Sequence, residues 1–138
     1  MGRMILLIVA VSSLIACTPF SSRPVAGAEP VFYRGQSDAV FATVVQAIST
    51  SPGLDDSNGW IIMQSDRAGG FVRAETSVEI RAGLMRVPQG RYERHTLSVV
   101  ISPVDESRTQ VVIQGTRLAG ELASRVAAAL VAEHGIAN

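Results

Sequence analysis

The chain has 138 residues and a formal net charge of zero, from 12 basic residues, all of them arginine, and 12 acidic ones. Because no basic excess or basic run stands out, the composition does not favour nucleic acid as a partner. The chain contains one cysteine, which excludes an intrachain disulfide framework, so the domain must be held together by its apolar core.

The chain begins with the layout of a secretory signal peptide. Arg3 precedes the apolar run MILLIVAVSSLIA, which ends at Cys17. A basic start, a short apolar core and small residues before a cleavage point are typical of exported proteins. The run is also shorter than the roughly 20 residues that span a bilayer. We therefore predict a signal peptide over residues 1–16.

The last four residues of this stretch, LIAC at 14–17, resemble the lipobox of bacterial lipoproteins. The resemblance implies cleavage before Cys17, a diacylglycerol on its sulfur and acylation of the new amino terminus. Two or more acyl chains anchor a protein stably to a bilayer. Thr18 follows the cysteine, which by similarity to enterobacterial sorting favours the outer membrane, with the domain facing the periplasm. The alternative is an ordinary signal peptide with an incidental cysteine.

Residues 17–30 read as a lipidated cysteine and a flexible tether. TPFSSRPVAGAEP, residues 18–30, is rich in Pro, Ser, Ala and Gly, a composition typical of linkers. Fully extended, it reaches on the order of 40 Å. We place a single domain at residues 31–138.

Within this domain the hydrophobic periodicity predicts the order β-α-β-β-β-β-α. A short strand at 31–33 precedes a helix that Ser37 caps. Strands follow at 60–66, 71–81, 91–102 and 109–115, and Thr116 caps a last helix. The apolar positions expected to face the core are Val40, Phe41, Val44, Val45 and Ile48 in the first helix, and Leu118, Leu122, Val126, Ala129 and Leu130 in the second.

The strands alternate apolar and polar residues, as expected for a sheet with one buried face. In 91–102, for example, Leu97, Val99 and Ile101 share the core side. The pattern predicts an α+β fold in which an antiparallel sheet of three to five strands carries two helices on one face, a helix-grip-like arrangement.

The segments SDAVFATVVQAI, WIIMQSDRAGGFVRAE and HTLSVVISPVDESRTQVVIQG, followed by a final helix, resemble several small bacterial envelope lipoproteins. Among these are uncharacterised lipoproteins and, more distantly, the helix-grip domains of BamC, an accessory lipoprotein of outer-membrane protein assembly. The resemblance implies an accessory role in the envelope. BamC carries two such domains, whereas this chain has room for one.

No set of residues predicts catalysis, a metal or a cofactor. His95 lies at the core edge of a strand, and His134 lies in the last helical turn, where a cation complements the helix dipole. No metal-ligand spacing links the two histidines. The carboxylate pairs Asp55–Asp56 and Asp105–Glu106 fall in turns, where Asp is common for backbone reasons. We therefore expect no enzyme activity, no metal and no cofactor.

Two surfaces are candidates for binding a partner. If Trp60 and Ile62 point away from the helices, they join Phe71, Tyr92, Val100 and Val112 in an apolar patch edged by Arg73, Glu75 and Arg94. The alternative is that loops or the tether cover this face. The second surface is the hairpin tip, where Leu84 and Met85 could enter a partner or a membrane, or fold back onto the core.

The sequence thus favours a lipid-anchored, non-enzymatic envelope domain that binds another envelope protein or serves in assembly. One alternative is a carrier of a small apolar ligand, which would need a pocket between helices and sheet. Another is a phage- or plasmid-encoded lipoprotein of surface exclusion.

Overall fold

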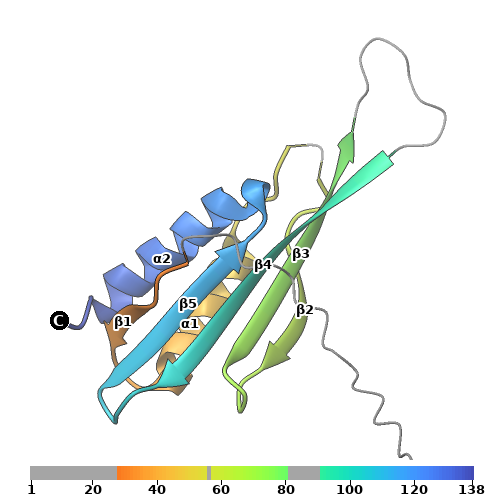
Figure 1. The fold of residues 1–138 in the computed structure, drawn as a ribbon. Helices are drawn as coiled ribbons and strands as arrows, with labels where there is room; N and C mark the ends of the chain where they lie inside the picture. The colour runs from red at the N-terminus through yellow and green to blue at the C-terminus, as the bar shows by residue number, and fades with distance from the viewer. Residues whose placement is uncertain (1–27, 56, 81–90) are drawn as a thin grey trace, which may run out of the picture.

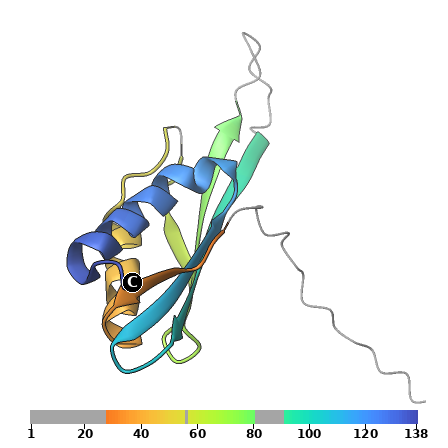
Figure 2. The ribbon, with the colours of Figure 1, turned by 60° about the vertical axis from the view of Figure 1, so that its left-hand side comes forward.

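The computed structural model describes residues 28–55, 57–80 and 91–138. The chain folds into a five-stranded antiparallel sheet with the strand order β1-β5-β4-β3-β2, and two helices cover one of its faces (Figures 1 and 2). The elements are β1 (Val31–Arg34), α1 (Ser37–Thr50), β2 (Ile61–Asp66), β3 (Phe71–Ile80), β4 (Arg91–Pro103), β5 (Arg108–Gly115), the short 3₁₀ helix η1 (Arg117–Ala119) and α2 (Gly120–His134).

The predicted fold class is confirmed: the domain is α+β and helix-grip-like, with the expected order of helices and strands. Neither expected helix cap acts through its side chain. Ser37 is the first residue of α1 and not its N-cap. Thr116 is the N-cap residue of η1, which leads directly into α2, but it makes no side-chain capping hydrogen bond. Thr116 instead turns its hydroxyl towards β4, where it accepts a hydrogen bond from the Thr96 amide at 3.2 Å.

The core lies between the helices and the sheet. Leu97, Val99 and Ile101 face it from β4, as the alternation predicts, and each is almost fully buried. Most of the predicted helix positions face the core as well, but Leu118 is 38% exposed because it falls in η1, ahead of α2. The buried core residues contributed by the helices are Val40, Phe41, Val44 and Ile48 from α1, and Leu122, Val126 and Leu130 from α2.

Both edges of the sheet are shielded against pairing with another chain. On the β1 edge, the C-terminal residues run alongside: the Ala137 amide donates to the Phe32 carbonyl at 2.8 Å, and the Arg34 amide donates to the Gly135 carbonyl at 3.2 Å. On the β2 edge, the register with β3 shifts between Ile62 and Gln64, which marks a β-bulge. Covered edges and bulges are two ways in which proteins prevent edge-to-edge association.

Strands β3 and β4 are longer than their neighbours, and their paired ends project past the helices as a two-stranded ribbon (Figure 1). We call residues Ser77–Ile80 and Arg91–Arg94 the ribbon. They stay paired, from Ser77 opposite Arg94 to Ile80 opposite Arg91. A two-stranded ribbon is marginally stable in water because neither further strands nor a helix cover its apolar side chains.

Candidate functional site

The sheet face away from the helices carries a row of apolar side chains. Val112, Val100 and Phe71 are direct neighbours across β5, β4 and β3. Phe32 extends the row diagonally, because it pairs with Gln110, two positions before Val112. Val100 is 39% exposed and Phe32 is 38% exposed. We call these four residues the apolar row.

Polar residues border the apolar row on both sides. Gln114, Ser98 and Arg73 form the next row in one direction. In the other direction the next row holds Ser102 and Gln110, with Phe32 at its end on β1. The exposed apolar surface is therefore a narrow stripe across the strands rather than the broad patch expected from the sequence.

The prediction that Trp60 and Ile62 belong to this face is wrong. Both pack against the buried core. Ile61 takes the outward position instead, opposite Glu75, and is 54% exposed. The physical reason is the bulge at Met63, because one extra residue reverses the face to which all preceding residues of the strand point.

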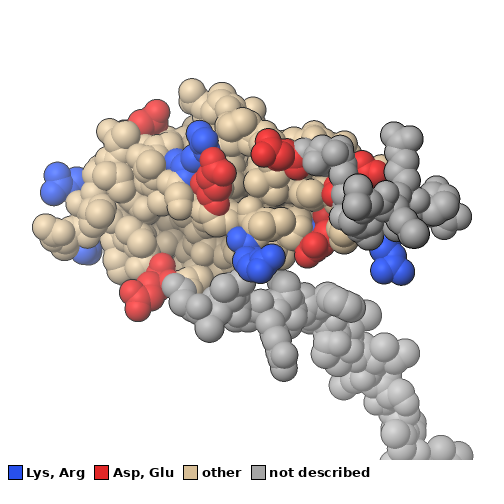
Figure 3. All heavy atoms as spheres, turned by 90° about the horizontal axis from the view of Figure 1, so that it is seen from above, with Lys and Arg blue, Asp and Glu red and all other residues tan. Residues whose placement is uncertain are grey.

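A carboxylate flanked by two arginines lies beside the apolar row. Glu75 Oε1 is 2.7 Å from Arg73 Nη2, and Glu75 Oε2 is 3.6 Å from Arg94 Nε. The Glu75 side chain is only 14% exposed, whereas that of Arg94 is 72% exposed. The face thus has a largely buried negative charge next to more exposed positive charges. Figure 3 shows that arginines and acidic side chains alternate on the side in view and do not form separate patches of one charge.

Tyr92 does not belong to the same surface as Phe71. At about 3.3 Å per residue along β4, it lies roughly 26 Å from Val100, out on the ribbon. There Tyr92 is 65% exposed and Ile80, on the paired strand, is 44% exposed. Phe71 and Tyr92 therefore mark two separate surfaces.

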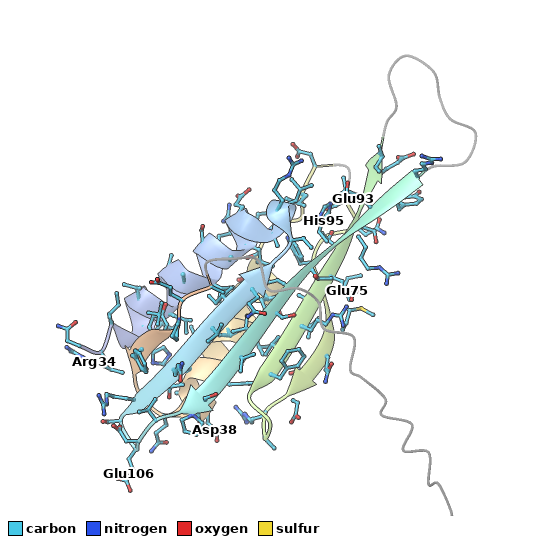
Figure 4. The ribbon with its side chains drawn as sticks, in the orientation of Figure 1. Arg34, Asp38, Glu75, Glu93, His95 and Glu106 are labelled. Atoms are coloured by element: carbon cyan, nitrogen blue, oxygen red, sulfur yellow. The ribbon has the colours of Figure 1, made fainter. Side chains whose placement is uncertain are left out.

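His95 faces the helices near the end of the sheet from which the ribbon departs (Figure 4). It pairs across the strands with Thr76, and both residues are 3% exposed. His95 Nδ1 lies 3.2 Å from Thr116 Oγ1. Among the described residues, His95 Nε2 and Thr76 Oγ1 are the two buried side-chain polar atoms without a hydrogen-bond partner. Glu93 Oε1 is 3.7 Å from Nε2, too far for a hydrogen bond.

His134 lies in the last turn of α2, as predicted, but it also joins the two helices. Its Nε2 is 2.9 Å from Thr43 Oγ1, which in turn is 2.7 Å from Glu133 Oε2. Thr43 is 5% exposed, so this cluster lies in the interface between α1 and α2 and presents no accessible nucleophile.

The predicted turn carboxylates lie in turns. Asp105 accepts hydrogen bonds from Arg108 Nε at 2.7 Å and from the Ser107 amide at 2.9 Å. These bonds, the one from Arg108 first, lower the pKa of Asp105 to about 2. Asp55 is exposed, and Asp56 lies outside the described residues. No opposed pair of carboxylates arises from these positions.

Two hollows lie side by side near the start of α1, with volumes of about 330 Å³ and 170 Å³. The larger one has a mainly polar lining that includes Asp38, Asp105 and Glu106. The smaller one lies against the β2–β3 turn, between Phe41 and Arg67. The smaller one is lined by Ser37 and Phe41 of α1 and by Ile101–Pro103 of β4, so it lies at the end of the interface between α1 and the sheet, and its volume is below the roughly 300 Å³ of an ordinary small-ligand pocket.

Three of the predicted site residues, Cys17, Leu84 and Met85, lie outside the described residues. Over residues 28–55, 57–80 and 91–138, no helix is long and apolar enough to cross a bilayer. The same described ranges contain no cluster of three or more His, Cys, Asp or Glu side chains arranged to hold a metal ion.

Neither a protein-family model nor a curated protein matches this chain. Among solved structures, it is similar to TTHA0849 from Thermus thermophilus, at 14% identity and a TM-score of 0.32, over 75% of this chain and 90% of that one. It is also similar to the Zhui aromatase/cyclase from Streptomyces sp. R1128, at 10% identity and a TM-score of 0.32, over 75% of this chain and 82% of that one.

The expectation that the protein is not an enzyme is corrected by this comparison. One of the similar structures is an aromatase/cyclase, so an enzyme is among the proteins that this chain resembles. At this level of similarity the resemblance assigns no reaction and no catalytic residue to the chain.

Sequence reasoning placed His95 on the core side of its strand but missed its surroundings. The register that sets Thr76 opposite His95 and the turn that brings Thr116 to its ring depend on strand pairing. The one signal in the sequence was polar residues, Thr76 and His95, at core-facing positions of two consecutive strands, which is uncommon for side chains without partners.

Proposed function

We propose that this chain is a lipid-anchored protein of the bacterial envelope whose domain binds an envelope protein, with the ribbon as the contact surface. The anchoring is supported by the lipobox resemblance at residues 14–17 and by the apolar leader before it. The tether of residues 18–30 would let the domain reach a partner near the membrane.

The observation that carries the choice of surface is the exposure of Tyr92 and Ile80, which alternate to opposite faces of the projecting ribbon. Aromatic side chains at exposed positions are enriched among residues that anchor protein interfaces. Figure 2 shows that neither α1 nor α2 covers the ribbon. The apolar row is narrower and bordered by polar side chains, so it ranks second.

The anchoring is tested by mass spectrometry of the protein purified from native membranes. The expected mass is that of a chain beginning at Cys17 with acyl chains attached, and a Cys17→Ser variant should leave the membrane fraction. An intact leader or an unmodified thiol would rule out this part of the proposal.

The contact surface is tested by site-specific photo-crosslinking in living cells, with a photoreactive residue at position 92 or 80. A matched control places it at Val131, which is 46% exposed on α2. We expect one discrete adduct from positions 92 and 80 and none from 131. Adducts that are equal at all three positions, or absent at 92 and 80, would remove the ribbon from the proposal.

A further inference from the structure

We propose that His95 and Glu93 bind a divalent first-row transition-metal ion between His95 Nε2 and Glu93 Oε1. The site lies where the ribbon leaves the body of the sheet, as the labelled side chains in Figure 4 show. It is independent of the proposed partner and of lipid anchoring.

The first step is the state of the His95 ring. Nε2 is buried and has no hydrogen-bond partner, which is unfavourable for a polar group removed from water. Nδ1 lies 3.2 Å from Thr116 Oγ1. That oxygen already accepts the Thr96 amide and has a second lone pair for the Nδ1 proton. With the proton on Nδ1, Nε2 presents a free lone pair, which is how metal-binding histidines are commonly oriented.

The second step is the distance between the two donor atoms. Nε2 and Glu93 Oε1 are 3.7 Å apart. A zinc ion bonds nitrogen at roughly 2.0–2.1 Å and carboxylate oxygen at roughly 2.0–2.2 Å, so it would fit between these two atoms with an angle of about 125° at the metal. Both residues belong to β4 and alternate to the same side, so no movement of the backbone is needed to bring them together.

The third step is the rest of the coordination shell. The Glu93 side chain is 59% exposed, which gives an ion and its waters access from solvent. Thr76 lies directly opposite His95, and its hydroxyl oxygen is the second buried atom without a partner. A metal-bound water that donates to Thr76 Oγ1 would satisfy this atom. An ion with such a water would therefore engage both unpartnered atoms.

One imidazole, one carboxylate and water favour zinc, nickel or copper over the harder magnesium and calcium ions. Two protein ligands make a weak site, and zinc is the probe to use. The competing explanation is that His95 and Glu93 form only an ion pair when His95 is protonated, with no role for a metal.

The test is calorimetric titration of the full-length protein in detergent with zinc chloride, after treatment with a chelator. We expect one saturable site and a rise in the unfolding temperature with zinc, because an ion that binds only the folded state stabilises it. Glu93→Gln should weaken the affinity at least about tenfold, the lower end of the loss seen even when an outer partner of a metal ligand is removed.

Two controls keep the result specific. Glu79→Gln alters an exposed carboxylate of the same ribbon that alternates to the opposite face, and His134→Gln removes the other histidine; both should retain zinc binding. In the parent protein, zinc should shift the NMR resonance of His95 Nε2. In Glu93→Gln this shift should be lost. No saturable binding, binding unchanged in Glu93→Gln, or binding lost in His134→Gln would overturn it.

Discussion

Individual residues determine the turns of this domain, and Gly70 is the position that least tolerates a side chain. It closes the β2–β3 turn with φ of 64°, and its carbonyl accepts the Ile101 amide at 2.7 Å. A Cβ at this position would collide with the Ile101 carbonyl oxygen. Gly59 also has a positive φ, of 79°, but nothing lies within 4 Å of its would-be Cβ.

Replacing Gly70 with alanine is therefore expected to lower the free energy of unfolding by more than about 2 kcal/mol, because the backbone strain of a left-handed residue adds to a steric clash. Gly59→Ala has the strain alone and should cost about 1 kcal/mol. Urea unfolding of the two variants measures the difference. Equal losses would show that the contact with Ile101 is unimportant.

The lowered pKa of Asp105 predicts how the free energy of unfolding depends on pH. Its pKa in the folded protein is about 2, against 3.8 for the free side chain, because Arg108 and Ser107 hydrogen-bond to the carboxylate. Between these values the unfolded chain binds more protons than the folded one, so this residue's contribution rises with pH through the window and is lost as pH falls through about 2. Asp105→Asn should flatten the dependence of the unfolding free energy on pH between about 4 and 2. Glu106→Gln, in the same turn, serves as the control, and equal slopes in both variants would contradict the assignment.

At the scale of elements, a buried polar contact links the two helices. Thr43 in α1 donates its proton to Glu133 in α2, and its oxygen is in reach of the Nε2 proton of His134. The two helices also contribute apolar side chains to the core. The Thr43 contact adds a polar link to this packing.

Thr43→Val keeps the volume of the side chain but removes these bonds, and it leaves a carboxylate and an imidazole without their partner. We expect a loss of about 1–3 kcal/mol in the free energy of unfolding. Ser124→Ala removes an exposed bond to the Gly120 carbonyl within α2 and should change stability by less than about 0.5 kcal/mol. If Thr43→Val behaves like Ser124→Ala, the contact is incidental.

For the whole molecule, the covering of the sheet edges limits edge-to-edge pairing with other chains. The C-terminal residues after α2 occupy the β1 edge through two backbone hydrogen bonds. Without them, β1 would present unpaired amide and carbonyl groups to other chains.

Deleting residues 135–138 is expected to lower the free energy of unfolding by about 1–3 kcal/mol and to cause association that grows with concentration. The deletion removes the two backbone hydrogen bonds to β1 and the bond from the Gly135 amide to the Val131 carbonyl at the end of α2. Light scattering over a concentration series measures the association. Ile136→Ser keeps the backbone bonds and changes only a half-exposed side chain, so it should remain as monomeric as the parent. A monomeric truncated protein would mean that β1 is protected in another way.

Local sequence patterns were enough to predict the order of elements, most of the core-facing helix positions and the inward side of β4. These features are local: apolar residues recur with period 3.6 in a helix and period 2 in a strand, and each period can be counted without knowing the neighbours. Val99 and Val126 face the core for this reason. The predicted lipobox at Cys17 is likewise a local pattern, and it stays a prediction.

Which residues share a surface depends on how the strands and helices pair and pack. The bulge at Met63 turned Trp60 inward, and the length of β4 separated Tyr92 from Phe71. Strand pairing set Thr76 opposite His95, and the turn after β5 brought Thr116 to the same ring. Register, bulges and turns depend on contacts between segments that are distant in the chain, so the periodicity of any one segment leaves them open.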